Sequence, residues 1–304
     1  MSNFILIIFC LIAGVTARRL NWVAKDGYKA LNAWVLYFGL PALSFSYLPT
    51  LKWDIGLLFT LLCPIVVLLG SIAFFQVLGN LLSLSRRSKH TLMLVGGFSN
   101  TSFVGFPLIT AYYGVEYLPY GIVADQMTFF LLSTIGVIIG MKGSLNSQQS
   151  IHIPFILKRV VTFPPFVGCV LALTLGRSID LSALEPFFKM ISSTVSPIAL
   201  FSIGLQLNFG IVKKEIPNLA YAISYKLLIA PLLVTIIAVL WKGTDHIYTV
   251  SVFEMAMPTL VSTSIVIDQF KLNNKLGNSA IGLSIPLSLI SSYLWYEILK
   301  IVLL

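Results

Sequence analysis

Long apolar segments alternate with short polar segments along the whole chain. Ten apolar runs end at charged or turn-forming residues, at about 3–17, 32–50, 55–82, 91–113, 118–141, 153–176, 190–209, 217–241, 246–268 and 278–303. A helix crosses the roughly 30 Å of hydrocarbon in a bilayer with about 20 residues. The strands of a membrane barrel would alternate apolar and polar side chains, and these runs do not. The pattern predicts an all-α integral membrane protein with ten transmembrane helices.

Composition supports a membrane location for nearly the whole chain. Of its 304 residues, 57% are hydrophobic and only 10% are charged, whereas soluble domains contain about 45–50% apolar and about 25% charged residues. So little charge excludes a soluble enzyme. The cysteines lie in apolar runs without a CxxC spacing and the histidines are isolated, so neither a disulfide framework nor a metal site is indicated.

The net charge of +9 indicates orientation rather than a nucleic-acid partner, because Lys and Arg concentrate in the cytoplasmic loops of membrane proteins. Fourteen basic residues fall on one side of the ten spans, five fall on the other, and Lys226 alone lies inside a span. The fourteen are Arg18, Arg19, Lys25, Lys29, Arg86, Arg87, Lys89, Lys142, Lys158, Arg159, Lys213, Lys214, Lys271 and Lys275; the five are Lys52, Arg177, Lys189, Lys242 and Lys300. We therefore expect a multi-pass protein of the cell (inner) membrane, with both termini outside and the 142–152 loop in the cytoplasm. The first run is followed by its positive charges rather than preceded by them, so it is interpreted as a span and not as a signal peptide.

The ten spans divide into two groups of five at the polar loop 142–152. The first group covers residues 1–141 and the second covers 153–304. Because five is odd, related groups must be inverted relative to each other in the membrane. Prolines recur at matching places in the two groups, at Pro41 and Pro197 and at Pro64 and Pro231. Inverted repeats with paired broken helices are typical of secondary transporters, whose breaks mark the binding site.

The fourth predicted span is interrupted near Asn100. Residues 96–107 combine three glycines, a proline and four consecutive hydrogen-bonding residues, Ser99, Asn100, Thr101 and Ser102. Unwound backbone at membrane depth survives only where it lines a cavity inside the protein. We expect Thr101 or Ser102 to cap a second half-helix, whose positive amino end suits a carboxylate.

The ninth predicted span is interrupted at Pro258. Proline lacks a backbone N–H and clashes with the preceding turn, so the helix is expected to break just before it and to restart with Pro258 in its first position. The two breaks are predicted to face each other. The predicted substrate-binding residues are Asn100, Thr101, Ser102, Pro258, Thr259 and Lys226.

Three ionisable residues lie within predicted spans, namely Asp125, Lys226 and Glu254. Each would cost roughly 2.5–3.5 kcal/mol at the centre of a bilayer, so all three must face protein or water. One interpretation makes Glu254 a cation ligand or proton carrier, Lys226 a counter-charge for an anionic substrate, and Asp125, followed by Gln126, a partner of one of them. The alternative is an ion pair of Lys226 with Asp125 or Glu254 that only ties helices together.

Two other groups of residues have ordinary explanations. Serine and threonine side chains at Thr128, Ser133, Ser262 and Ser264 are expected to be hydrogen-bonded contacts between membrane helices. Tryptophans near the span ends are expected in a belt at the membrane surface. These are Trp22, Trp53, Trp241 and Trp295.

Four segments together resemble the auxin efflux carrier family of membrane permeases. They are Asn100-Thr101 with Gly105-Phe106-Pro107, Ala124-Asp125-Gln126, Lys226 to Pro231, and Met257-Pro258-Thr259. The resemblance covers the whole chain, and the short central loop is similar to that of the bacterial branch, whose members export or exchange small organic acids. It implies a 5+5 inverted repeat in which spans 1, 2, 6 and 7 form a scaffold that dimerises. Spans 3–5 and 8–10 would form a mobile transport domain, with the broken fourth and ninth spans crossing at the substrate site.

The same architecture occurs in bile-acid:sodium symporters. Ser99-Asn100 and the segment Glu254 to Met257 are similar to the sodium-ligating segments of those proteins. The resemblance therefore adds Na⁺, held by Ser99, Asn100 and Glu254, to H⁺ as a candidate coupling ion. No other cofactor or metal is expected.

These observations favour a secondary transporter of small organic anions such as carboxylates, which works by elevator-like alternating access. The predicted coupling residues are Glu254, Asp125, Ser99 and Gln126. The expected partners are the lipid bilayer, the substrate anion and a second copy of the chain. Two alternatives stay open: a sodium-coupled carrier of bulky amphipathic anions of the bile-acid type, and a membrane channel or sensor. An enzyme is not expected, because no nucleophile or cofactor motif accompanies the buried carboxylates.

Overall fold

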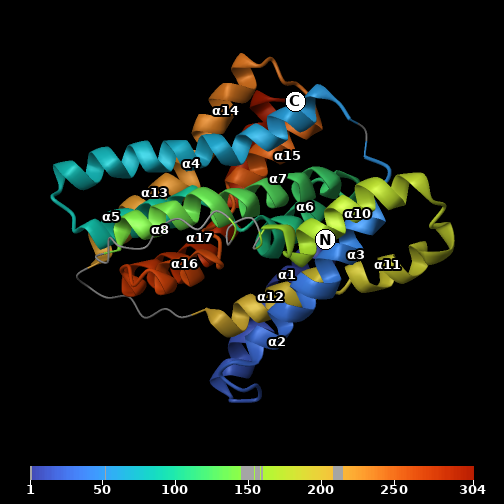
Figure 1. Ribbon diagram of the computed structural model, residues 1–304, viewed down its shortest axis with the longest axis horizontal. Coiled ribbons are helices and arrows are strands. Elements are labelled where there is room, and N and C mark those ends of the chain that lie inside the picture. Colours follow the sequence, from blue (N-terminus) through green and yellow to red (C-terminus); the bar gives the residue numbers. More distant parts are fainter. Residues whose placement is uncertain (1, 52, 145–153, 155–157, 159, 208–214) are drawn as a thin grey trace. The chain divides into compact units, whose positions relative to one another are not determined.

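The computed structural model describes residues 2–304 apart from 52, 145–153, 155–157, 159 and 208–214 (Figure 1). The described chain is helical and contains one isolated antiparallel bridge but no longer strand. Five of the described helices are long and apolar enough to cross a membrane: Ile55–Leu81, Val115–Gly143, Ser182–Gln206, Ile216–Leu240 and Asn274–Val302. They overlap the third, fifth, seventh, eighth and tenth predicted spans. The all-helical class is confirmed, whereas the complete set of ten spans in a 5+5 repeat stays a prediction.

The other predicted spans contain shorter helices. The first contains α1 (Ser2–Arg19), the second contains α2 (Gly27–Trp34), η1 (Val35–Gly39) and α3 (Leu40–Tyr47), and the sixth contains α10 (Pro164–Ser178). The fourth contains α5 (Arg86–Gly97), η2 (Thr101–Gly105) and α6 (Phe106–Tyr112), and the ninth contains α15 (His246–Met255) and α16 (Thr263–Gln269). Most of the predicted 142–152 loop, together with Lys52, Arg159, Lys213 and Lys214, lies outside the described residues.

The chain folds into two compact units. Unit 1 comprises Met1–Trp53, Ser102–Ile122 and Leu157–Leu207, and unit 2 comprises Asp54–Thr101, Val123–Ile156 and Asn208–Leu304. Each unit therefore combines segments from both predicted repeats. The repeat boundaries at 141 and 153 remain a prediction from the sequence.

Unit 1 is organised around the packing of α1 against α12 (Val195–Gln206), which lie side by side in Figure 1. Glycines permit a close approach of their backbones. A Cβ atom added to Gly14 would lie 2.8 Å from the Cα of Gly204, and one added to Gly204 would lie 2.9 Å from the Cα of Gly14. Small residues at such crossings are the usual means by which membrane helices come together. Elsewhere in unit 1, α3 packs against α10 and α11 (Glu185–Ser192).

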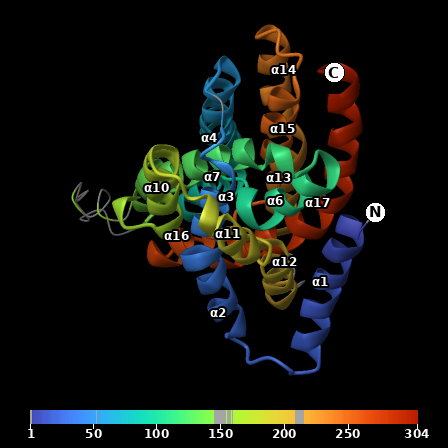
Figure 2. The same cartoon turned by 90° about the vertical axis from the view of Figure 1, so that its right-hand side faces the viewer.

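Unit 2 is built on the long helices α4 (Ile55–Leu81) and α17 (Asn274–Val302), the latter drawn in red in Figure 2. Helix α4 packs against α5, α14 (Ala230–Leu240) and α15. Helix α17 packs against α5, α13 (Ile216–Ser224), α15 and α16. Unit 2 also includes most of α7 (Leu118–Leu131), all of η4 (Leu132–Gly136) and all of α8 (Val137–Gly143). Helix α5 therefore lies among the helices of the second half of the chain.

Three turns of π-helix each begin six residues before a proline. They are η1 before Pro41, η2 before Pro107, and η7 (Tyr225–Ile229) before Pro231. Proline has no N–H to give to the carbonyl four residues earlier, and its ring collides with that carbonyl in a regular helix. A turn widened by one residue relieves this collision without ending the helix. At these places proline widens the helix locally and does not break it.

Trp295 supplies a hydrogen bond to the carbonyl that Pro231 leaves without its usual donor. The indole Nε1 of Trp295 donates to the carbonyl oxygen of Leu227, four residues before Pro231, at 2.7 Å. The predicted belt position is therefore wrong for Trp295, which is 6% exposed, whereas Trp22 is 73% exposed. The position of a tryptophan near a span end does not reveal that a carbonyl on a neighbouring helix lacks a hydrogen-bond donor.

We expect Trp295→Phe to destabilise the protein by about 1–3 kcal/mol, because it removes the donor from a buried carbonyl. Thermal unfolding of the purified protein in detergent measures the loss. Trp22→Phe, at an exposed position, is the matched control. Adding Pro231→Ala to Trp295→Phe returns a backbone N–H to the helix and should recover part of the stability. An equal loss in the single and double variants would contradict this explanation.

Candidate functional site at the crossing of two broken helices

The fourth and ninth predicted spans are broken, and their broken segments pair with each other. Helix α5 ends at Gly97 and α15 ends at Met255. Ser99 and Thr259 form an antiparallel bridge. The backbone N–H of Asn100 donates to the carbonyl of Pro258 at 2.8 Å, and that of Leu260 donates to Phe98 at 3.0 Å. The predicted interruptions are therefore present, and each interrupted segment provides hydrogen-bond partners for backbone groups of the other.

This pairing changes two details of the expected breaks. The second half of the ninth span begins with α16 at Thr263, and not at Pro258. The reason is that Pro258 and Leu260 are held in the bridge, so they are unavailable for a helical turn. In the fourth span, Thr101 and Ser102 lie inside η2 rather than at its cap, and both are buried. Asn100 is the residue that directly precedes this half-helix.

Lys226 connects the two breaks from η7. Its side chain is fully buried, and its ammonium nitrogen donates to the hydroxyl of Ser99 at 2.6 Å and to the carbonyl of Met255 at 3.1 Å. The second bond gives the last residue of α15 a donor for its carbonyl. Among the described residues, Lys226 and Glu254 form no ion pair within 4.0 Å. Lys226 thus uses two of its three protons to hold protein atoms at the crossing.

Thr101 and Asp125 form a second buried contact at the start of η2. The hydroxyl of Thr101 donates to a carboxylate oxygen of Asp125, on α7, at 2.5 Å. A short bond to an ionised acceptor is among the stronger hydrogen bonds in proteins. Asp125 therefore fixes the first residue of the half-helix that follows Asn100.

Thr259 is engaged on both its backbone and its side chain. Its N–H donates to the hydroxyl of Ser284, on α17, at 3.2 Å, and its own hydroxyl donates to the carbonyl of Val95 at 2.8 Å. The sequence pointed to Thr259 as a substrate ligand. The structure places it as a connector between α5, the bridge and α17.

Two fully buried polar side chains at the crossing have no hydrogen-bond partner among the described residues. They are Asn100, for both its amide nitrogen and its amide oxygen, and Glu254, for both carboxylate oxygens. Leaving a buried polar atom unsatisfied costs about 1–3 kcal/mol, and more for a charged group. Native proteins rarely accept this cost unless the group serves a function. Asn100 and Glu254 are therefore the side chains of the site that are available to a ligand.

Glu254 lies within electrostatic range of both other buried charges. The charged groups that act on it are Asp125 and Lys226. These are hydrogen-bonded to Thr101 and Ser99, the two residues that flank Asn100. The three charges and the unpaired amide thus belong to one site in unit 2.

The remaining predicted residues contribute less to this arrangement. Gln126 follows Asp125 on α7, and its side-chain oxygen has no hydrogen-bond partner among the described residues. The sequence did not identify the carbonyls of Val95 and Met255 as parts of the site. A pattern of side chains does not identify which backbone carbonyls take part in a site. Only the glycines after Val95 and the proline after Met257 indicated that the helices are interrupted nearby.

Comparison with known proteins relates the chain to a family of membrane transport proteins. The sequence profile of a family described as membrane transport proteins matches residues 1–296. An uncharacterized transporter of Methanothermobacter thermautotrophicus is 23% identical over 300 residues, covering 96% of each chain. The uncharacterized transporter YfdV of Escherichia coli K12 is 24% identical, covering 99% of this chain and 98% of its own. The mouse lysosomal cholesterol signaling protein is 26% identical over 93% of this chain but only 36% of its own length.

The match to the family extends over nearly the entire sequence, including both broken helices and all three buried charges. The expected resemblance is therefore confirmed at the level of the family. The chain belongs to the membrane transport protein family, that of the auxin efflux carriers.

Proposed function

We propose that the protein is a secondary transporter of small organic anions, which bind at the crossing of the broken helices. The observation that carries this proposal is the pair of fully buried, unpartnered side chains, Asn100 and Glu254. An amide offers a donor to an anion, and a carboxylate offers a place for a coupling cation. A transporter of this type moves its substrate by alternating access around the crossing.

Asn100 is well placed to receive a carboxylate. It directly precedes the apolar half-helix Thr101–Tyr112, and the amino end of a helix carries a partial positive charge. The amide nitrogen of Asn100 has no acceptor among the described residues. The hydroxyls of Thr101 and Thr259 already donate to protein atoms, so in this proposal they position the two broken segments rather than bind the anion.

The buried charges explain why an anion would need a coupling cation. Asp125, Lys226 and Glu254 are the buried charged side chains among the described residues. When all three are ionised, the site has a net charge of −1 and repels an anion. Because an uncompensated charge is costly in a poorly solvated site, an anion enters more favourably once Glu254 is neutral and the charges of Asp125 and Lys226 cancel.

A proton on Glu254 fits the site better than Na⁺. Of the three oxygen-bearing residues that the sequence suggested for Na⁺, Ser99 already accepts a bond from the Lys226 ammonium. The amide oxygen of Asn100 and the carboxylate oxygens of Glu254 remain without a partner in the described part of the chain, and a proton needs only one of these carboxylate oxygens. We therefore propose H⁺ as the coupling ion, carried by Glu254, with Asp125 and Gln126 as the other residues that take part in coupling.

In this proposal the chain lies in the cell membrane with both termini outside. The first, second, sixth and seventh predicted spans hold the scaffold, through which two copies associate. The spans that carry the buried charges move with the substrate.

Uptake into proteoliposomes tests this function. Radiolabelled mono- and dicarboxylates are offered while pH, Na⁺ and voltage gradients are imposed in turn. We expect accumulation of at least one small carboxylate that depends on the pH gradient. Strict dependence on Na⁺ with bulky sterol acids as substrates would favour the bile-acid type, and unitary conductance in a planar bilayer would indicate a channel. No carboxylate uptake under any gradient would reject the proposal.

A further inference from the structure

Unit 1 contains a separate cavity of about 280 Å³, close to the lower end of the size range of small-molecule pockets. Its walls come from the start of α1, the end of α3, the half-helix α6, and the corner between α11 and α12. The apolar part of the lining includes Leu6, Leu43, Pro107 and Leu118. All of these residues belong to unit 1, and none belongs to the crossing site described above.

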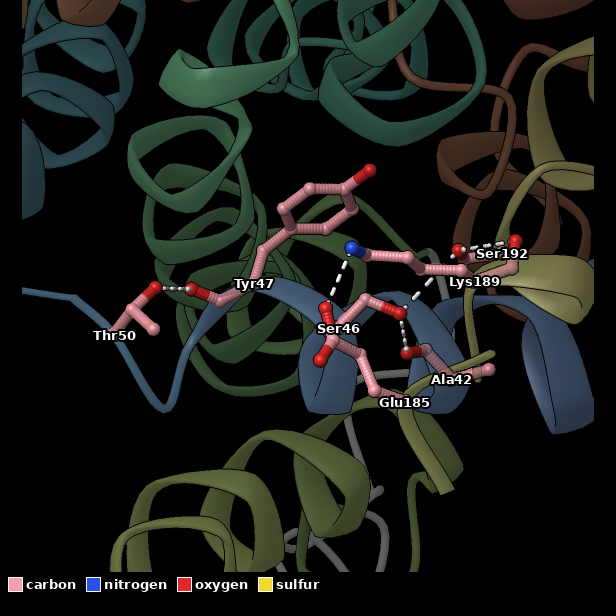
Figure 3. Close-up of polar contacts among 7 residues, drawn as sticks. All are labelled: Ala42, Ser46, Tyr47, Thr50, Glu185, Lys189 and Ser192. Carbon is pink, nitrogen blue, oxygen red and sulfur yellow. Dashed lines mark hydrogen bonds and ion pairs between the residues drawn. The ribbon is translucent and has the colours of Figure 1, made fainter. Parts of the chain in front are cut away.

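The polar end of this cavity is formed by Lys189 and Tyr47. In Figure 3 the ammonium group of Lys189 lies between the ring of Tyr47 and the carboxylate of Glu185. Its ion pair with Glu185 is 2.5 Å long, and both side chains are about half exposed, at 56% and 53%. The charge of Lys189 acts on the phenol of Tyr47. The cavity therefore has one cation, one phenol and no acidic residue in its lining.

The corner that carries Lys189 is braced by hydrogen bonds of its serines. The hydroxyl of Ser192 donates to the carbonyl of Lys189 at 3.1 Å and lies 3.4 Å from the hydroxyl of Ser46, on α3 (Figure 3). The hydroxyl of Ser193 donates to the carbonyl of Met190 at 2.7 Å. Ser192 and Ser193 thus use their protons on neighbouring carbonyls, whereas Lys189 contributes the one cation of the described lining and Tyr47 its phenol. A braced backbone holds these donors in place before a ligand arrives.

We propose that this cavity is a second binding site, which takes a small organic anion with an apolar body. The carboxylate of the ligand takes the place of the Glu185 carboxylate at Lys189 and accepts a hydrogen bond from the Tyr47 phenol. The apolar body lies against Leu6, Leu43 and Leu118. The exchange is inexpensive because an exposed ion pair contributes little to stability. The ligand class rests on the proposed function, but the site does not depend on transport.

Equilibrium binding to the full chain in nanodiscs tests the site without a transport step. The probe is 4-fluorophenylacetate, followed by ¹⁹F NMR titration, and the neutral 4-fluorophenylacetamide is the matched ligand control. All titrations use an Asn100→Ala background, so that binding at the crossing does not contribute. We expect the acid to bind and the amide to bind at least about tenfold more weakly, because only the acid makes a charge-assisted bond.

Variants assign the binding to this cavity. Lys189→Met should weaken the acid about tenfold and Tyr47→Phe by about three- to tenfold, as expected for loss of a charged and of a neutral hydrogen bond. Glu185→Gln should tighten it about two- to fivefold, because it removes the competing carboxylate. Lys300→Met, at another exposed lysine, should change nothing. Thermal unfolding verifies that each variant is folded.

The inference fails if the acid does not bind, if the amide binds equally well, or if Lys189→Met and Tyr47→Phe leave the affinity unchanged. These outcomes are independent of uptake. A protein that binds the probe in this cavity but transports no carboxylate would retain this inference while refuting the proposed function. A protein that transports a carboxylate but does not bind the probe in this cavity would retain the proposed function and refute the second binding site.

Discussion

Glu254→Gln is expected to abolish accumulation driven by a pH gradient. Glutamine keeps the size of the side chain but can neither gain nor lose a proton, so the anion no longer moves with H⁺. One pH unit corresponds to 1.36 kcal/mol, which supports about tenfold accumulation per coupled proton. In proteoliposomes with a one-unit gradient, the ratio of internal to external substrate should therefore fall from about tenfold to about one.

Glu254→Gln should keep its ability to exchange substrate across the membrane. Its side chain is neutral, as the site requires when the anion is bound. Glu116→Gln, at an exposed position on η3 (Val115–Tyr117), is the control and should accumulate substrate normally. Accumulation by Glu254→Gln equal to that of the natural sequence would show that another group carries the proton.

Lys226→Met is expected to cause the largest loss of stability, about 3–5 kcal/mol. It removes the donors to Ser99 and Met255, and it leaves the buried carboxylates of Asp125 and Glu254 without a compensating cation. Breaking a buried charged network by removal of one member has costs of this size. Chemical denaturation in mild detergent, followed by tryptophan fluorescence, measures the difference.

A double variant separates the charge of Lys226 from its hydrogen bonds. Lys226→Met with Glu254→Gln removes one positive and one negative charge, so its loss of stability should be smaller than the sum of the two single losses by about 1–2 kcal/mol, a typical coupling energy for neighbouring residues. The hydrogen bonds to Ser99 and Met255 stay absent in both. Simple additivity of the two substitutions would mean that Glu254 does not respond to the charge of Lys226.

The sequence was sufficient for features that depend on neighbouring residues. An apolar run of about 20 residues forms a helix in a membrane because no other structure satisfies its backbone there. The interruptions near Asn100 and Pro258 were predicted because glycine, proline and clustered hydroxyls disfavour a continuous helix. Charge scarcity likewise singled out Asp125, Lys226 and Glu254, since each is costly in hydrocarbon.

The sequence was insufficient wherever the partner of a residue is distant along the chain. Pro258 was expected to start a helix, and the bridge to residue 100 prevents this. Trp295 was expected at the membrane surface, and a carbonyl 68 residues away holds it inside. Local preferences amount to fractions of a kcal/mol for each residue, and a tertiary hydrogen bond to a buried group outweighs them.

Local hydrophobicity and backbone chemistry were therefore enough to predict the all-helical class, the positions of the two broken helices and the small set of buried charges. The folded structure shows which of the polar side chains at the site already have hydrogen-bond partners in the protein. Lys226 bonds to Ser99 across 127 residues and Thr259 bonds to Val95 across 164. Only such contacts distinguish them from Asn100 and Glu254, whose polar atoms have no hydrogen-bond partner among the described residues. Satisfaction of a buried polar group is a property of the folded arrangement, since its partners come from segments that only folding brings together.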